Sequence, residues 1–148
     1  MKTKSATTLA FALFLGCMLI APISAQPNKP LKCELTMNVI WLPVPHWEGT
    51  VTGDIVGTVT VNELPPSFPG KTEHFSETFE IVTADGVIRG LDDGVWNMKT
   101  YKWRANGYIT EATGIWTGLV GCHVHEMGTT SPLGPEVTAW GTITIMYG

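Results

Sequence analysis

The sequence predicts an all-β domain, a single eight-stranded antiparallel barrel, preceded by a cleaved signal peptide. Apolar and polar residues alternate with period two in several segments, which is typical of strands with one buried face. Gly and Pro interrupt the chain at short intervals, and no helical stripe exceeds a turn or two. Short strands of this kind form a barrel or a two-sheet sandwich. We favour the barrel because closure removes exposed strand edges, and the sandwich stays as the alternative.

Residues 1–25 have the pattern of a secretory signal peptide. Lys2 and Lys4 precede an apolar run at 9–20, which is too short to span a bilayer comfortably, and Ala25 is a small residue before the expected cut. Cleavage would leave one β-barrel domain, 26–148, secreted or periplasmic. Two alternatives stay open: an uncleaved membrane anchor, and a lipid anchor on Cys17.

Composition narrows the function classes. The 148 residues carry a net charge of −4, and 44% of them are apolar. This apolar content excludes a wholly disordered chain, and the acidic balance argues against a nucleic-acid partner. We expect no membrane span in the mature chain and no cofactor, and homo-oligomerisation stays open.

Four segments alternate most clearly, and each predicts one strand. Their inward residues are Cys33, Leu35, Met37 and Val39 in the first, Val51, Ile55, Val59 and Val61 in the second, Phe75, Phe79 and Ile81 in the third, and Val137, Ala139, Ile143 and Ile145 in the last. With the strands between them the count is about eight. An eight-stranded barrel has an interior just wide enough for side chains or one small ligand.

Turn signals separate these strands. Pro-rich loops are expected at 42–45 and 64–70, and another loop at 129–135. Ala84-Asp85-Gly86 predicts a tight hairpin turn. Asp92-Asp93-Gly94 and Asn106-Gly107 predict further turns or bulges.

The mature chain keeps two cysteines, Cys33 and Cys122, both on the apolar side of their segments. An oxidising compartment favours a disulfide between them. This bond would close a loop of roughly 90 residues, worth ~4 kcal/mol in the chain-entropy model. Two buried thiols that act as small apolar residues are the alternative.

Two carboxylates are candidate catalytic groups. Glu77 shares the inward alternation of Phe75 and Phe79, where burial would raise its pKa and suit it to acid or base chemistry. Glu126 falls on the inner side of its own segment, so Glu77, Glu126 and Tyr108 or Tyr101 could line one cavity mouth. The alternative for Glu77 is a register break toward solvent, or an ion pair with Arg89 or Arg104.

His123 and His125 are weak candidates for metal ligands. In a strand they point to the same side, a spacing that suits chelation of one ion. A third ligand, His46 or His74, is unsupported by spacing. We therefore predict no metal site and place both imidazoles on the outer face or the barrel rim.

The segment Ala112-Thr113-Gly114-Ile115-Trp116-Thr117-Gly118-Leu119-Val120-Gly121 resembles a motif of the allene oxide cyclase and dirigent barrels. In that motif a small-Thr-Gly turn is followed by an aromatic residue, a small or apolar pair, and Gly. The resemblance covers about ten residues. It implies an exported eight-stranded barrel with an apolar cavity, whose relatives guide cyclisation or coupling of reactive apolar molecules. The resemblance does not identify a catalytic residue at any position of this sequence.

Our leading hypothesis is a barrel that binds a small apolar molecule in its interior, with cyclase or isomerase chemistry as a subset. The candidate ligand-binding residues are Tyr108, Trp116, Phe75 and Phe79. A second hypothesis is a secreted interaction module without enzymatic activity, in which Trp41, Trp47 or Trp140 forms a contact patch. A third is a metal-binding barrel that uses His123 and His125.

Overall fold

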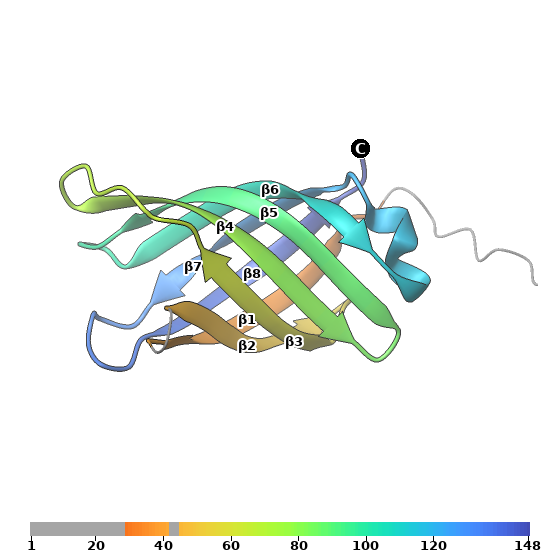
Figure 1. Cartoon of the computed structure of the whole chain (residues 1–148), viewed down its shortest axis with the longest axis horizontal. Helices are drawn as coiled ribbons and strands as arrows, with labels where there is room; N and C mark the ends of the chain where they lie inside the picture. The colour runs from red at the N-terminus through yellow and green to blue at the C-terminus, as the bar shows by residue number, and fades with distance from the viewer. Residues whose placement is uncertain (1–28, 42–44) are drawn as a thin grey trace, which may run out of the picture.

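The computed structural model describes residues 29–41 and 45–148, so the predicted signal peptide and most of the first Pro-rich loop lie outside the described residues. The described chain is a closed barrel in which each strand pairs antiparallel with the next (Figure 1). The predicted fold class is confirmed. No helix in the described ranges is long and apolar enough to cross a membrane.

Eight strands and one short helix make up the chain. They are β1 Leu31–Ile40, β2 His46–Gly53, β3 Gly57–Glu63, β4 Thr72–Thr83, β5 Gly86–Asn97, β6 Lys102–Ala112, the 3₁₀ helix η1 Gly114–Leu119, β7 His123–Thr130 and β8 Thr138–Met146. The barrel closes where β8 pairs with β1, from Leu31 opposite Ile145 to Asn38 opposite Thr138. Closure leaves no unpaired edge among these strands.

Period-two alternation sorts the side chains into an inside and an outside. Along β6, for example, Ala105, Gly107 and Ile109 are buried and their neighbours are exposed. The inward residues of the end of the barrel near η1 are aliphatic, and Val51, Ile88 and Ile145 are at most 1% exposed. A filled apolar core therefore occupies this part of the interior.

Two features differ from the predicted pattern of strands and turns. The segment from Val51 to Val61 is two strands, because the chain turns at 54–56 after Gly53, whose φ of 117° favours glycine. Ile55 keeps its predicted burial inside that turn, with 1% exposure. Asp92-Asp93-Gly94 and Asn106-Gly107 are not turns but the middle of β5 and β6, where the two segments pair with each other. The predicted hairpin turn at Ala84-Asp85 is confirmed.

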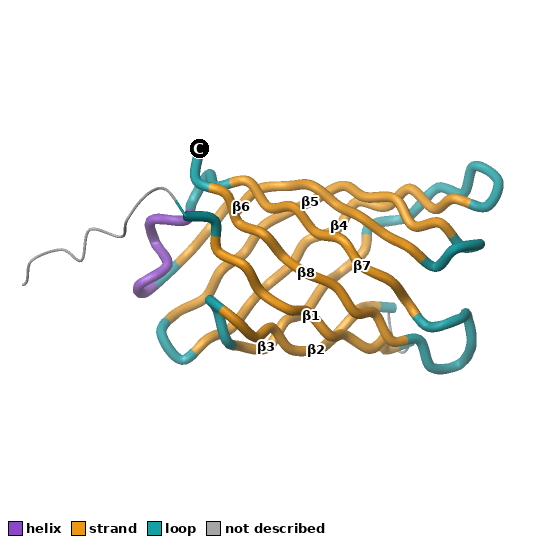
Figure 2. The backbone as a smooth tube through the Cα atoms, turned by 180° about the vertical axis from the view of Figure 1, so that it is seen from behind, coloured by secondary structure: helices purple, strands orange, loops and turns teal. Residues whose placement is uncertain are grey.

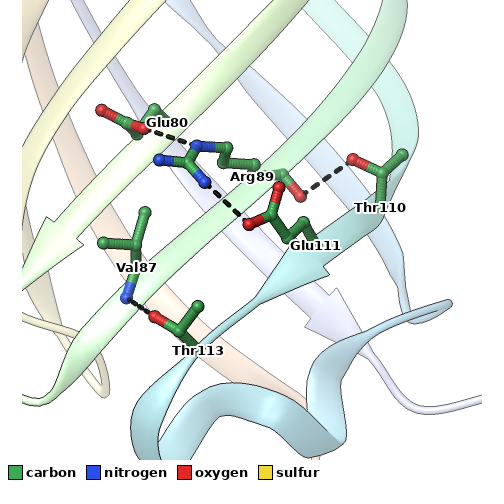
Figure 3. A network of polar contacts seen from close by, with 6 residues as sticks. All are labelled: Glu80, Val87, Arg89, Thr110, Glu111 and Thr113. Atoms are coloured by element: carbon green, nitrogen blue, oxygen red, sulfur yellow. Dashed lines mark hydrogen bonds and ion pairs between the residues drawn. The ribbon is translucent and has the colours of Figure 1, made fainter.

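One end of the barrel is closed by η1, which lies near the C-terminus in both views (Figures 1 and 2). Gly114 has a φ of 63°, and a Cβ there would lie 1.8 Å from the carbonyl oxygen of Asp85, so only glycine fits this turn. Leu119 is buried in the core, and the Trp116 indole donates to Thr83 Oγ1 at 2.9 Å. The backbone N–H of Val87 donates to Thr113 Oγ1 at 2.9 Å (Figure 3).

The other end carries the longer connections 64–71, 98–101 and 131–137, which gather at the end away from η1 (Figure 1). The 98–101 turn has neither Gly nor Pro. Asn97 Oδ1 instead accepts from the backbone N–H groups of Lys99 and Thr100, each at 3.0 Å. The two cavities described below lie at this end.

The predicted disulfide is wrong, since Cys33 and Cys122 are both buried, free thiols. Strand β8 separates their positions, because Cys33 pairs with Ile143 of β8 and Cys122 directly precedes β7 on its far side. Two strand spacings amount to about 9.6 Å. A disulfide tolerates a Cα separation of at most about 7 Å. Burial raises the pKa of both thiols, which keeps them protonated.

Leu119 should be the residue of η1 on which closure of this end depends. Leu119→Ala should lower the free energy of unfolding by about 2–5 kcal/mol, because it leaves a cavity in the core. Ile115→Ala in the same helix is the matched control: Ile115 is 68% exposed, and its loss should cost less than about 0.5 kcal/mol. Urea unfolding measures both, and equal effects would show that η1 does not plug the barrel.

Candidate functional site

Three carboxyl groups meet inside the barrel at its mid-height. Glu77 on β4, Asp92 on β5 and Glu126 on β7 are 8%, 2% and 4% exposed. One carboxylate oxygen from each lies within 4.8 Å of the others. We call these three residues the carboxyl cluster. Sequence reasoning predicted Glu77 and Glu126 as inward candidates but assigned Asp92 to a turn.

The strand register explains why the three residues meet. Glu77 and Asp92 are direct cross-strand partners on β4 and β5. Strand β6 separates β5 from β7, and its inward residues at this height are Gly107, opposite Asp92, and Ala105, opposite Glu126. A Cβ on Gly107 would lie 2.5 Å from the Cβ of Asp92. The small residues of β6 therefore leave the space in which the carboxyl groups approach one another.

Within residues 29–41 and 45–148, no basic side chain forms an ion pair with the carboxyl cluster. Arg89 points to the outer face, where it bonds Glu80 at 2.6 Å and Glu111 at 2.8 Å (Figure 3), and Arg104 is exposed. Neither oxygen of Asp92 has a fixed hydrogen-bond donor. Among the described residues, the carboxyl of Glu77 is within hydrogen-bond reach and can donate once it is protonated. The predicted alternatives for Glu77, an arginine partner or a turn toward solvent, are thus excluded.

Burial without a counter-charge raises the pKa of every member of the carboxyl cluster. For Glu77 the pKa lies well above the usual value, first because of burial and then because of repulsion from Asp92 and Glu126. Burial raises the pKa of Asp92 to about 6, although its hydrogen bond with Glu77 opposes the shift. Burial and repulsion from Asp92 raise the pKa of Glu126 to about 8. The cluster therefore retains protons near neutral pH.

This arrangement is suited to proton transfer. Carboxyl groups that titrate near the working pH can both donate and accept a proton, whereas ordinary Asp and Glu residues are fully ionised there. The same three oxygens are also the only group of three or more His, Cys, Asp or Glu side chains in 29–41 and 45–148 placed to share a metal ion. An all-oxygen set would suit Ca²⁺ or Mg²⁺ rather than Zn²⁺, and such an ion would have to displace the retained protons.

A small inner cavity of about 40 Å³ lies directly above the carboxyl cluster, and Glu77 forms part of its wall. Its other walls include Phe75, Trp96 and Trp103. This space has room for a few water molecules, which need roughly 10–15 Å³ each, but not for an organic ligand of ordinary size. The inner cavity therefore lies between Glu77 of the carboxyl cluster and the larger space above.

A second cavity of about 610 Å³ occupies the open end of the barrel. Its volume falls within the usual range of small-molecule sites, roughly 300–1,000 Å³. It shares four lining residues with the inner cavity, which are Trp47, Glu63, Glu73 and Trp96. We call it the mouth cavity. Its remaining walls are mostly apolar and come from Val39 of β1, His46 of β2 and the connections between strands.

The predicted ligand-binding residues fall in different places. Phe75 lines the inner cavity, and Phe79 is 5% exposed within the packed core below it. Tyr108 is 49% exposed on the outer face, where its ring meets His123 edge to face, so its predicted position at the cavity mouth is wrong. Trp116 packs at the closed end, away from both cavities. The residues missed by sequence reasoning are Glu63, Glu73, Trp96 and Trp103.

His123 and His125 lie on the outer face of β7, as their positions on the strand predict. His125 Nδ1 bonds Asn106 Oδ1 at 2.7 Å, and His123 contacts Tyr108. Neither belongs to a group of three potential ligands within the described part of the chain. His46, considered as a distant third ligand, lies instead at the mouth cavity and bonds Glu48 at 3.0 Å.

Comparison with known proteins gives no relative. No family model, no curated protein and no solved structure matches this chain. The site must therefore be interpreted from its own geometry.

The free energy of unfolding should fall as the pH rises from about 5 to 8. Carboxyl groups whose pKa is higher in the folded than in the unfolded state stabilise the fold at low pH, and this contribution is lost as pH rises through about 6 for Asp92 and about 8 for Glu126. Each proton bound in excess by the folded state adds a slope of about 1.4 kcal/mol per pH unit.

Glu126→Gln should make this slope shallower, because the amide stays neutral at every pH. Glu34→Gln is the matched control, since Glu34 is exposed on the outer face of β1. Urea unfolding at a series of pH values measures the slope for each protein. A wild-type stability that is flat or rises between pH 5 and 8 would contradict the raised pKa values.

Proposed function

We propose that this protein binds a small molecule with a mainly apolar body in the mouth cavity, above a carboxyl cluster that exchanges protons with it. The observation that carries the proposal is that the two cavities adjoin, with four lining residues in common. The ligand-sized mouth cavity shares walls with an inner cavity that reaches Glu77. A ligand seated in the mouth would point one end toward a protonated carboxyl group.

The shape of the barrel supports a binding role. Leu119 and Trp116 close one end, so a ligand enters and leaves at the end where the mouth cavity opens. The rim there exposes large apolar side chains, with Leu64, Phe68 and Leu133 more than half exposed. Apolar surface at the entrance of a concave site is what a small apolar ligand requires.

Acid–base chemistry follows from the same arrangement. A protonated Glu77 would donate a proton, through water in the inner cavity, to one atom of a molecule bound in the mouth cavity, and an ionised carboxylate of the cluster would take a proton back from another atom by the same water route. Isomerisation or cyclisation by this route changes no oxidation state and needs no cofactor. Holding the ligand in one folded shape would add the advantage of orientation.

The resemblance to the allene oxide cyclase and dirigent barrels agrees with this proposal. The residues that carry it form the Gly114 turn and η1, which close the end of the barrel opposite the mouth cavity. We accordingly propose a barrel of that general kind, exported by the segment 1–25. The carboxyl cluster stands on its own geometry and is not transferred from those proteins.

A secreted interaction module is the second candidate. Trp41 and Trp140 are 45% and 46% exposed, which favours a contact patch, but Trp47 turns inward and donates to Glu63 at 2.7 Å. Trp41 also lines the mouth cavity, together with the exposed residues of the rim. A binding site for a small molecule accounts for these side chains without a partner protein.

Binding is tested with N-phenyl-1-naphthylamine, a neutral fluorophore that brightens in apolar sites. The wild-type protein should enhance its emission with saturation at one equivalent. Trp96→Ala should weaken this binding at least tenfold, because Trp96 lines both cavities, whereas the control Trp140→Ala on the outer face should not. No saturable enhancement, or equal losses in both variants, would reject the mouth cavity as a ligand site.

A further inference from the structure

Every charged side chain in the walls of the two cavities is acidic. Glu63 and Glu73 line both cavities, and Glu77 lines the inner one. No Lys or Arg lines either cavity in the described part of the chain, and His46 is the only other titratable group in the walls. The charged side chains around a ligand in this space therefore create a negative electrostatic potential.

Glu73 is the most unusual of these carboxyl groups. It is 7% exposed, yet no hydrogen-bond donor or basic group among residues 29–41 and 45–148 reaches it. Burial, together with repulsion from Glu63, raises the pKa of Glu73 to about 7. A buried carboxyl group without a partner costs stability unless a ligand supplies the missing donor or counter-charge.

Aromatic rings surround the same two carboxyl groups. Trp96 is the direct cross-strand partner of Glu73, so the two side chains stand next to each other on the inner wall. The Trp47 indole donates to Glu63 Oε1 at 2.7 Å, which holds that carboxylate in place against the wall. The indole N–H of Trp96 has no partner. Tryptophan faces attract cations, and rings around a carboxylate are a common way to hold an ammonium group.

We propose that the ligand of the mouth cavity is a small organic cation, with an ammonium group held by Glu73 and Glu63 between Trp47 and Trp96 and an apolar body against the rim. This inference rests on the proposed binding function and names the chemical class of its ligand. An ammonium group would supply Glu73 with its absent donor and relieve the repulsion between the two glutamates. The apolar rim would cover the rest of such a molecule.

Three probes with the same naphthyl group but different charges show whether the charge of the ligand determines its affinity. They are 2-naphthylmethylamine, which is a cation at neutral pH, 2-naphthalenemethanol, which is neutral, and the carboxylate of 2-naphthylacetic acid, which is an anion. Isothermal titration calorimetry of the full mature chain should show the amine binding at least tenfold more tightly than the alcohol. The anion should not bind.

Glu73→Gln should abolish the preference for the amine while leaving the affinity for the alcohol within twofold. The variant removes a charge but no volume, and loss of a buried, unpartnered carboxyl group should leave the fold intact, which its thermal unfolding would verify. Glu34→Gln, on the exposed outer face of β1, is the matched control and should keep the full preference.

The outcomes separate this inference from the proposed function. Equal affinities for the amine and the alcohol would overturn the cationic ligand and leave the binding site standing. A preference that survives in Glu73→Gln would also overturn it, because the charge would then be recognised elsewhere. If none of the three probes binds and N-phenyl-1-naphthylamine also fails, the proposed function falls with it.

Discussion

Closure of the barrel is the constraint on which the rest of the structure depends. Once β8 pairs with β1, every second residue of every strand faces the interior, which opens to solvent only at the end that carries the mouth cavity. An acidic residue at an inward position must then be buried, whatever the cost. At the closed end the interior is filled by aliphatic side chains, and above them Glu77, Asp92 and Glu126 form a polar layer.

The interior therefore divides by height into zones with different roles. The aliphatic zone and η1 stabilise the barrel and seal one end. The carboxyl cluster above them is destabilising, because burial and mutual repulsion oppose ionisation of all three groups. The tryptophans and glutamates of the open end surround empty space instead of filling it. Such a loss of stability beside a cavity is typical of functional sites.

Sequence reasoning predicted the architecture because alternation is a local property. It placed Glu77 and Glu126 inside, since both follow unbroken alternation on strands with obvious apolar neighbours. It missed Asp92 because Asp-Asp-Gly is a common turn, and only the pairing of β5 with β6 makes it a strand. The predicted inward position of Tyr108 is wrong because the buried residue beside it is Gly107, which has no apolar side chain to mark the inner face of β6. The prediction of a disulfide is wrong because the sequence does not show that β8 lies between the two cysteines.

Three carboxyl groups share one buried site and keep protons near neutral pH. Side-chain carboxyl ¹³C NMR, followed from pH 3 to 9 and assigned with single Gln or Asn variants, tests it most directly. The resonances of Asp92 and Glu126 should titrate near pH 6 and 8, and replacing either residue should shift the titration of Glu77. Independent titration of all three groups below about pH 5 would contradict the account, because exposed Asp and Glu titrate there.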